Sequence, residues 1–315
     1  MPFNKIGLAA CALALTCTTC VAAAAETFPT RPIRLISPFA PGGGNDIMSR
    51  TLGAAISKGL GQSIDVDNRP GANTIVAMEI LARATPDGYT LLTTSSSQAT
   101  NATLYAKLPY DSIKSFAPVS RIGVSPLIVA VNPALPIKSV NDLIAAAKAK
   151  PGGIMYPSAG TGNSTHLAGE LFAAMAGVSL THVPFKGLGP GLLDLMAGRL
   201  HVAFSTAPSA LPHVKTGRLR ALAVTSGARS ALAPGLPTVA ESGVPGYDAS
   251  TWYGIIAPGN RAAQSRNHHR ARHAGIAGTT DDGRRRSCAE YAGAICRVDS
   301  VRNRQVGKDH QAVRG

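Results

Sequence analysis

Short apolar runs alternate with amphipathic segments between residues 26 and 258. Apolar runs predict strands, and apolar residues three or four positions apart predict helices. Strands are expected at residues 33–38, 64–67, 90–94, 127–131, 155–158, 201–205 and 222–225, with a further strand opening at Trp252. Helices are expected at residues 46–60, 77–84, 140–150 and 165–175. This alternation predicts an α/β fold in which helices cover a mainly parallel sheet.

The two ends of the chain depart from this pattern. Residues 1–25 carry Lys5, an apolar run too short to cross a bilayer, and then three alanines. We interpret them as a secretory signal peptide that is cleaved near Glu26; a lipoprotein signal at Cys11 and a buried helix are the alternatives. Residues 261–315 contain no Leu, Phe, Met or Trp. Such a segment buries too little apolar surface to offset the entropy of ordering it.

The net charge of +14 suggests nucleic-acid binding at first sight, but half of it belongs to residues 261–315. The remaining body is only mildly basic, which suits a small anionic ligand and not a nucleic-acid surface. All five cysteines lie at residues 11–20 and 288–296. Residues 26–258 therefore contain neither a disulfide framework nor a thiol nucleophile.

A glycine-rich turn follows the first expected strand. Residues 38–46 read PFAPGGGND and open the first expected helix. Close backbone approach at glycine, together with the N–H groups and positive dipole of a helix start, favours an anion there. The spacing matches neither G-x-G-x-x-G nor G-x-x-x-x-G-K-[ST], which argues against a nucleotide. An ordinary turn with Asp46 as the helix cap is the alternative.

A second loop of the same kind follows the expected strand at residues 155–158. Residues 156–166 read YPSAGTGNSTH and again place glycines and hydroxyls at a helix start. Simple helix caps at Ser164 or Thr165 are the alternative. Two such loops, about 120 residues apart, would face each other across a cleft if each belonged to a different lobe.

Catalytic and metal sites find little support in the sequence. A hydrolase using Ser164 and His166 needs an oriented acid and a nucleophile elbow, and the chain has no G-x-S-x-G motif. His182, His201 and His213 are scattered without the spacing of metal ligands. We therefore expect a protein that is not an enzyme and that binds neither a metal nor a cofactor.

With these motifs the chain resembles the Bug family of periplasmic receptors, the solute-binding components of tripartite tricarboxylate transporters. The matching segments, in family order and spacing, are residues 29–34, 38–50, 68–72, 86–92, 116–119, 158–170, 183–187, 236–238, 241–243 and 252–258. The resemblance implies a type II periplasmic-binding-protein fold, with a carboxylated ligand in the cleft between two lobes. It also implies that loop backbone groups and ordered water hold the ligand carboxylate, without an arginine clamp.

The resemblance implies a first lobe at residues 26–124 and 244–258 and a second lobe at residues 125–243. Hinges are expected near residues 123–127 and 243–252. The expected ligand-binding residues are Phe39, Pro41, Gly42, Gly43, Gly44, Asp46, Ser158, Gly160, Thr161, Gly162, Ser164, Thr165 and Ser205. A branched side chain at Gly43 is expected to weaken binding, because it would block close approach of the backbone.

This chain departs from the family at four places. Gln98 stands where histidine is frequent, Ser205 and Thr206 where aspartate is frequent, and Asn73 where glycine is usual; these differences leave the ligand's identity open. After Pro258 the family continues with leucine-rich helices that complete the first lobe, whereas this chain becomes arginine-rich. We interpret residues 259–315 as an aberrant, disordered tail produced by a reading-frame shift; a genuine basic tail is the alternative.

Together these features predict a monomeric solute-binding protein, located in the periplasm. It is expected to capture a small carboxylic acid and to pass it to the membrane components of a tripartite tricarboxylate transporter, with no nucleic-acid partner. The alternative functions are a receptor that presents its ligand to a sensor, and a periplasmic Ser/His hydrolase.

Overall fold

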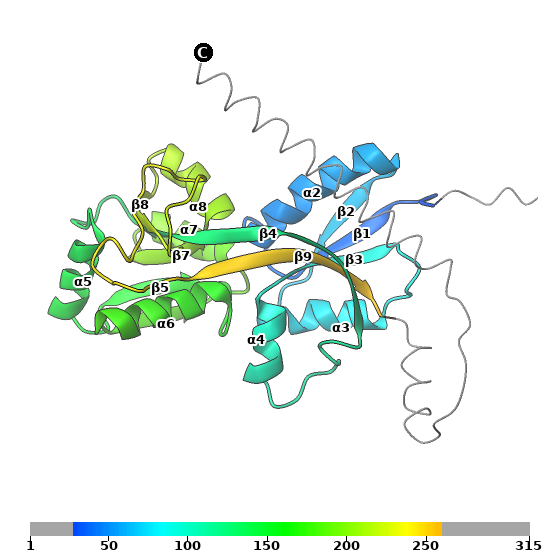
Figure 1. Cartoon of the computed structure of the whole chain (residues 1–315), viewed down its shortest axis with the longest axis horizontal. Helices are drawn as coiled ribbons and strands as arrows, with labels where there is room; N and C mark the ends of the chain where they lie inside the picture. Colours follow the sequence, from blue (N-terminus) through cyan, green and yellow to red (C-terminus); the bar gives the residue numbers. More distant parts are fainter. Residues whose placement is uncertain (1–27, 260–315) are drawn as a thin grey trace, which may run out of the picture.

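A computed structural model describes residues 28–259. The expected signal peptide and all of the arginine-rich segment beyond Gly259 lie outside the described residues. Within the described range, no helix is both long and apolar enough to cross a membrane. Two groups of helices and strands, the first and second lobes, lie at opposite ends of the molecule and are joined by two long strands (Figure 1).

The first lobe is built on three parallel strands, in which β1 (Ile33–Ser37) lies between β2 (Ile64–Asn68) and β3 (Thr90–Ser95). Its helical segments are α2 (Gly44–Leu60), the 3-10 turn η1 (Ala72–Thr74), α3 (Ile75–Arg83) and α4 (Ser97–Leu104). Leu35 of β1 belongs to one buried cluster with Leu52 and Ile56 of α2. The apolar face of α2 therefore packs on the sheet.

The second lobe contains the strands β5 (Ile154–Ser158), β6 (Leu180–Pro184), β7 (Val202–Thr206) and β8 (Arg220–Val224). Its helices are α5 (Val140–Ala149), α6 (Ser164–Ala176), α7 (Leu188–Met196) and α8 (Ala207–Lys215). β5 and β6 pair in parallel, and the His201 N–H donates to the Met155 carbonyl, so β7 lies beside β5. The rings of Phe172 and Phe204 pack 5.4 Å apart and tie α6 to β7.

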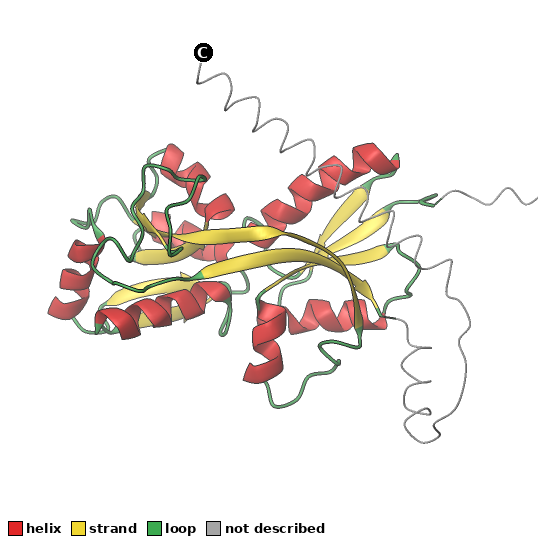
Figure 2. Ribbon diagram, in the orientation of Figure 1, coloured by secondary structure: helices red, strands yellow, loops and turns green. Residues whose placement is uncertain are grey.

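Two long strands, β4 (Phe116–Val131) and β9 (Ser250–Pro258), cross between the lobes. They pair antiparallel from Phe116 opposite Pro258 to Pro126 opposite Ser250. β9 also pairs with β3 in the first lobe, and β4 pairs with β7 and β8 in the second. A single sheet of seven strands therefore runs through both lobes (Figure 2).

The expectation of a mainly parallel sheet was wrong. The pairings β1–β2, β1–β3 and β5–β6 are parallel, whereas β3–β9, β4–β7, β4–β8 and β4–β9 are antiparallel. The chain passes between the lobes on extended strands, which join each sheet without the helical crossover that parallel pairing requires. The strand expected at residues 127–131 is the end of β4, and β6, α4, α7 and α8 were not expected.

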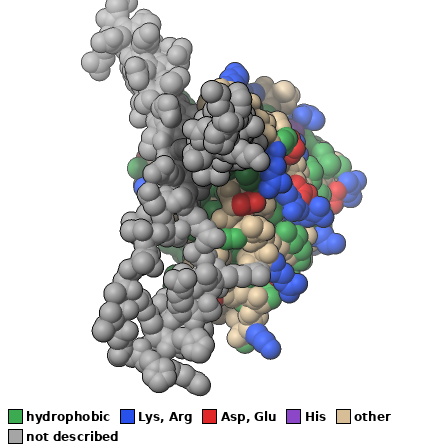
Figure 3. All heavy atoms as spheres, turned by 90° about the vertical axis from the view of Figure 1, so that its right-hand side faces the viewer, with side chains coloured by type: hydrophobic (Ala, Val, Ile, Leu, Met, Phe, Trp, Pro, Cys, Tyr) green, Lys and Arg blue, Asp and Glu red, His purple; other side chains and the backbone are tan. Residues whose placement is uncertain are grey.

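Opposite charges are interspersed on the first lobe. Arg31 pairs with Asp87, and Arg34 and Arg69 both pair with Asp67. On the face drawn in Figure 3, Lys and Arg side chains lie beside Asp and Glu side chains. The basic residues of this face therefore do not form a continuous field of one sign.

Candidate functional site

The first glycine loop is held by an internal network around Asp46. The Asp46 carboxylate accepts hydrogen bonds from the Gly42 N–H at 3.0 Å, from Arg50 at 3.0 Å and from Asn68 at 2.9 Å. Burial opposes ionisation of Asp46, but these hydrogen bonds outweigh it and hold its pKa below the usual range. Gly42 has φ +81°, a conformation that favours glycine. Asp46 thus shapes the loop, and its carboxylate is occupied by the protein itself.

The start of α2 leaves room for backbone alone at Gly44. A Cβ atom placed there would lie 2.4 Å from Thr206 Oγ1 and 2.5 Å from the Tyr253 hydroxyl oxygen. Gly43, in contrast, has φ −81°, and a Cβ on it would meet its nearest neighbour, the Leu188 nitrogen, at 3.6 Å. The close contact with neighbouring protein groups therefore occurs at Gly44, where side chains of β7 and β9 pack against the helix start. Close approach of a ligand to the backbone at Gly43 stays a prediction.

The second loop ends in a capped helix. The Asn163 side-chain oxygen accepts from the Thr165 N–H and the Thr165 hydroxyl, both at 3.0 Å, and so caps α6. Thr165 Oγ1 in turn accepts from the Ala159 N–H at 2.9 Å. These bonds fold the loop back on the start of α6 and leave the helix terminus facing the first lobe.

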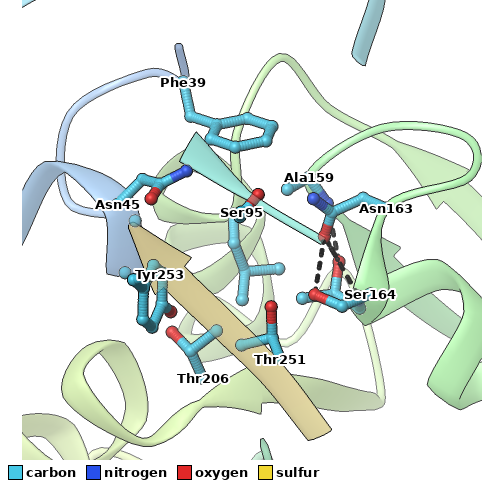
Figure 4. A pocket seen from close by; sticks show the side chains of 13 residues that line it. Phe39, Asn45, Ser95, Ala159, Asn163, Ser164, Thr206, Thr251 and Tyr253 are labelled. Atoms are coloured by element: carbon cyan, nitrogen blue, oxygen red, sulfur yellow. Dashed lines mark hydrogen bonds between the residues drawn. The ribbon is translucent and has the colours of Figure 1, made fainter. Parts of the chain in front are cut away.

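A small cavity of about 30 Å³ lies between the starts of α2 and α6. Figure 4 shows Asn45 and Tyr253 on one side of this inner cavity and Asn163 and Ser164 on the other, with Ser95 between them. The residues that line it are Phe39, Gly43, Gly44, Asn45, Ser95, Ala159, Asn163, Ser164, Thr165, Leu188, Thr206, Thr251 and Tyr253. None of these side chains is formally charged at neutral pH, so the two helix termini supply the positive potential of the cavity.

Three buried polar atoms of the inner cavity lack a hydrogen-bond partner. They are the Asn45 side-chain oxygen, Ser95 Oγ and the Tyr253 hydroxyl. Burial raises the pKa of Tyr253 to about 12, although the neighbouring Thr206 hydroxyl acts in the opposite direction, so Tyr253 is a neutral hydrogen-bond donor at physiological pH. An unpaired buried polar group costs about 1–3 kcal/mol. A ligand or a bound water that pairs with these atoms removes that cost.

A second, outer cavity of about 270 Å³ adjoins the first. Both cavities are lined by Phe39 and Ala159. The other residues around the outer cavity are Gly71, Ala72, Asn73, Thr74, Tyr105, Gly160, Thr161, Pro184, Phe185 and Lys186. Its lining includes one cationic side chain, that of Lys186, which is exposed.

The structure separates the expected ligand-binding residues into three groups. Phe39, Gly43, Gly44, Ser164 and Thr165 line the inner cavity. Gly160 and Thr161 line the outer cavity. The remaining expected residues, Pro41, Gly42, Asp46, Ser158, Gly162 and Ser205, line neither cavity.

Ser205 shows why one expected residue misses the cavity. Successive side chains of a strand point to opposite faces, so Ser205 and Thr206 of β7 face opposite ways. Thr206 lines the inner cavity, while Ser205 is fully buried and its hydroxyl donates to the Thr206 carbonyl. The lining residues that sequence reasoning missed include Ser95, Thr251 and Tyr253, which lie on β3 and β9, far from both glycine loops in the sequence.

A half-buried histidine pair lies behind the second loop. Ser158 Oγ lies 2.5 Å from His182 Nε2, and the ring of His182 packs 4.0 Å from that of His166. His166 Nδ1 accepts from the Gly162 N–H at 3.2 Å. Burial lowers the pKa of both rings, to about 4 for His182, where the charge of His166 adds to the effect. Both histidines are therefore neutral at pH 7, and they position the loop.

This geometry does not favour the hydrolase alternative. The Ser164 hydroxyl donates to the Asn163 side chain at 3.4 Å, while Nδ1 of His166 is occupied by the loop backbone. Ser158, which does contact a histidine, is fully buried. Within the described part of the chain, no three His, Cys, Asp or Glu residues are grouped as metal ligands.

The lobes touch directly across the cleft. The Ala40 N–H donates to the Lys186 carbonyl at 3.0 Å. On α4, Ser97 Oγ accepts from the Asn163 amide at 2.9 Å and Thr100 Oγ1 donates to the Gly162 carbonyl at 3.0 Å. The structure is thus a closed arrangement of the two lobes.

Known proteins resemble this chain over most of its length. A family model described as tripartite tricarboxylate transporter family receptor matches residues 48–266. Protein BugT of Bordetella pertussis is 40% identical over 236 residues, which are 74% of this chain and 72% of that protein. A protein from the tcbD-tcbE intergenic region of a Pseudomonas species is 38% identical over 252 residues, or 80% of this chain and 75% of that protein.

Solved structures of periplasmic binding proteins also resemble this chain over most of its length. Rpa4515 of R. palustris, solved with adipate, is 35% identical with a TM-score of 0.71 and is matched over 87% of this chain and 97% of that chain. MatC of Rhodopseudomonas palustris, solved with malate, is 27% identical with a TM-score of 0.72, over 86% of this chain and 85% of that chain. The periplasmic binding protein BugD is 27% identical with a TM-score of 0.74, and the match covers 85% of this chain and 83% of that chain.

These findings confirm the expected two-lobed, type II periplasmic-binding-protein fold and the resemblance inferred from the glycine loops. The family is one of solute-binding receptors and not of enzymes. This chain belongs to the tripartite tricarboxylate transporter receptor family, the Bug-type periplasmic solute-binding proteins.

Proposed function

We propose that this protein captures a small carboxylic acid between its two lobes and delivers it to the membrane components of a tripartite tricarboxylate transporter. The ligand carboxylate occupies the inner cavity, between the starts of α2 and α6. The protein acts in the periplasm, as a monomer. The lobes comprise residues 26–124 with 244–258, and residues 125–243.

The observation that carries this proposal is the neutral, polar inner cavity at two helix N-termini. A carboxylate there receives the positive ends of two helix dipoles and has no fixed negative charge beside it. Ser95 Oγ and the Tyr253 hydroxyl, which lack partners, become donors to its oxygens. The unpaired oxygen of Asn45 is an acceptor, so it pairs with a water that in turn donates to the carboxylate.

The relatives support the same ligand class. Rpa4515 was solved with adipate and MatC with malate, and both are carboxylic acids. The two differ in length and in a hydroxyl group. A receptor that holds the carboxylate by helix termini and hydroxyls, and leaves the rest of the ligand to an adjoining cavity, accommodates such variety within one fold.

Calorimetric titration of a panel of mono- and dicarboxylic acids tests the proposal. We expect at least one acid to bind, and we expect Tyr253→Phe to weaken its binding about tenfold or more, because a hydrogen bond to a charged group is lost. Tyr110→Phe is the matched control, since the Tyr110 hydroxyl is also buried without a hydrogen-bond partner but lines neither cavity. Failure of every acid to bind, or equal effects of the two substitutions, would contradict the proposed site.

A further inference from the structure

The outer cavity contains an unusual side chain on the turn that follows β2. Asn73 is 8% exposed and lines this cavity together with Tyr105, Gly160 and Thr161. Its side-chain oxygen is buried and has no hydrogen-bond partner.

The backbone of this turn is held in a conformation that few residues adopt. Ala72, Asn73 and Thr74 have φ values of +43°, +45° and +81°. Asparagine tolerates the left-handed region better than other residues with a side chain, but glycine adopts it at no steric cost. The turn therefore does not need a side chain at position 73, and the one present brings an unpaired polar atom.

The neighbouring Asn101 fixes which end of the Asn73 amide lacks a partner. The Asn101 amide nitrogen donates to the Asn73 backbone carbonyl at 2.6 Å and lies 3.2 Å from Thr74 Oγ1. The Asn101 side-chain oxygen is consequently the end that faces Asn73, where it accepts from the Asn73 amide nitrogen at 2.8 Å. Reversing the Asn73 amide would set two oxygens against each other, so its oxygen is the free acceptor.

We propose that Asn73 accepts a hydrogen bond from a hydroxyl group of the bound acid, so that the receptor selects hydroxylated carboxylic acids over their unsubstituted parents. The inference rests on the proposed function, since the carboxylate must occupy the inner cavity for the rest of the ligand to reach the outer one. Both cavities share Phe39 and Ala159, so one ligand can extend from the first into the second.

The charge around the outer cavity selects a hydroxyl over an ammonium group as the donor. Lys186 lines the same cavity, and its positive charge opposes a second cation there. A site built around a buried acceptor discriminates strongly against an analogue without the donor, because the acceptor is then left unpaired. The selection therefore acts mainly by rejecting the parent acid.

Matched pairs of acids test this selection. The dissociation constants of succinate and malate, glutarate and 2-hydroxyglutarate, adipate and 3-hydroxyadipate, and benzoate and 3-hydroxybenzoate are measured by calorimetry. For at least one pair we expect the wild-type protein to bind the hydroxylated member about tenfold or more tightly. Asn73→Gly should bring that ratio to about one while keeping the turn, since glycine adopts its φ freely.

Two further measurements separate the outcomes. Lys186→Met, the matched control in the same cavity, should leave the ratio of the pair unchanged. The thermal midpoint of Asn73→Gly verifies that the variant is folded. If carboxylates bind but every pair has a ratio near one, or if the ratio survives in folded Asn73→Gly, the selection by Asn73 is overturned and the proposed function stands. If no acid binds the wild-type protein, both fail.

Discussion

Gly44, at the start of α2, has no room for a side chain between Thr206 and Tyr253. We predict that Gly44→Ala weakens binding of any carboxylate ligand by at least about tenfold, because its methyl group would displace Thr206 and Tyr253 from the inner cavity. Gly59→Ala, on the same helix, is the matched control and should change affinity much less, since a Cβ there meets nothing within 4 Å and Gly59 lines neither cavity. Calorimetry on both variants checks this. Equal losses in the two would show that the helix start is not the binding element.

The histidine pair behind the second loop predicts a pH dependence of stability. The folded pKa of His182, about 4, lies below its ordinary value of 6.5, so the unfolded chain binds more protons between these values. Stability is therefore complete above about pH 6.5 and declines as the pH falls toward 4. Carboxylates with lowered pKa values, such as Asp46 and Asp67, lose their contribution only at lower pH.

Thermal midpoints measured from pH 7 to pH 4.5 test this dependence. The wild-type midpoint should fall over that range, and it should fall less in His182→Asn, which keeps a polar side chain but does not titrate. Parallel curves for the two proteins would show that His182 does not cause the decline. The same neutral pair holds the backbone of the second loop, so ligand affinity should weaken over the same pH range.

Residues that line the inner cavity were predictable from sequence where a local motif marks them, whereas their contacts with a ligand stay predictions. Glycines and hydroxyls at a helix start identify Gly44, Ser164 and Thr165, because the anion-binding property of a helix terminus is carried by the terminus itself. Ser95 and Tyr253 give no such signal. They lie on strands whose side chains alternate between two faces, and only the assembled sheet decides which face meets the cavity.

A helix and a strand with regular apolar patterns were predictable, whereas two helices that contain proline were not. The expected helix at residues 46–60 corresponds to α2, and the expected strand at residues 64–67 to β2. α7 contains Pro190 and α8 contains Pro212, and a proline in the pattern argues for a helix end. Both helices form because their apolar residues pack on the second-lobe core.

The crossing strands β4 and β9 predict how the lobes move. We expect ligand to close the lobes by bending at the crossing, near residues 123–127 and 243–252, and so to reduce the radius of gyration. Gly189→Ala places a methyl group 2.2 Å from the Pro41 carbonyl oxygen of the other lobe. This variant should remain less compact than wild type when ligand is saturating.

Small-angle scattering with and without a saturating carboxylate measures this difference. Gly59→Ala is the control, because a Cβ at that position on α2 meets nothing within 4 Å. Equal compactness of the wild-type protein in both conditions would contradict closure. Full compaction of Gly189→Ala would contradict the contact between α7 and the first loop.

An apolar groove of about 710 Å³ lies on the first lobe along β4, β9 and α4. Its lining includes Ile113 and Val124, which are 84% and 59% exposed. A groove lined by exposed apolar side chains is suited to packing against a further segment. The sequence after Pro258, which lies beyond the described residues apart from Gly259, contains no leucine with which to cover it.

If residues 259–315 result from a frame shift, another reading frame of the gene beyond the codon for Pro258 should encode apolar, helix-periodic sequence. A chain with the repaired frame should then unfold at a higher temperature and aggregate less, because buried apolar area stabilises the first lobe. Sequencing of the gene and calorimetric melting of both chains check this. Other frames without helical periodicity would exclude the shift.

The whole molecule was predictable from sequence only through resemblance. Composition and periodicity indicate an α/β chain with two anion-binding loops, and no local pattern states that the loops face each other. That placement depends on β4 and β9 returning through both lobes, a contact between residues more than 120 positions apart. Such pairings are decided by packing of the complete fold and leave little trace in any short window.

The ladder of β4 and β9 also bears on which contacts limit the release of a bound ligand. Its register shifts occur between Pro118 and Ser120 and between Arg121 and Gly123, beside the crossing. Irregularities of this kind let a strand bend without losing the pairing on either side. We therefore expect opening of the lobes to break few backbone hydrogen bonds of this ladder, and we expect the barrier to ligand release to arise mainly from the contacts across the cleft. Substitutions in the cleft should then change the residence time of the ligand while the hinge stays the same.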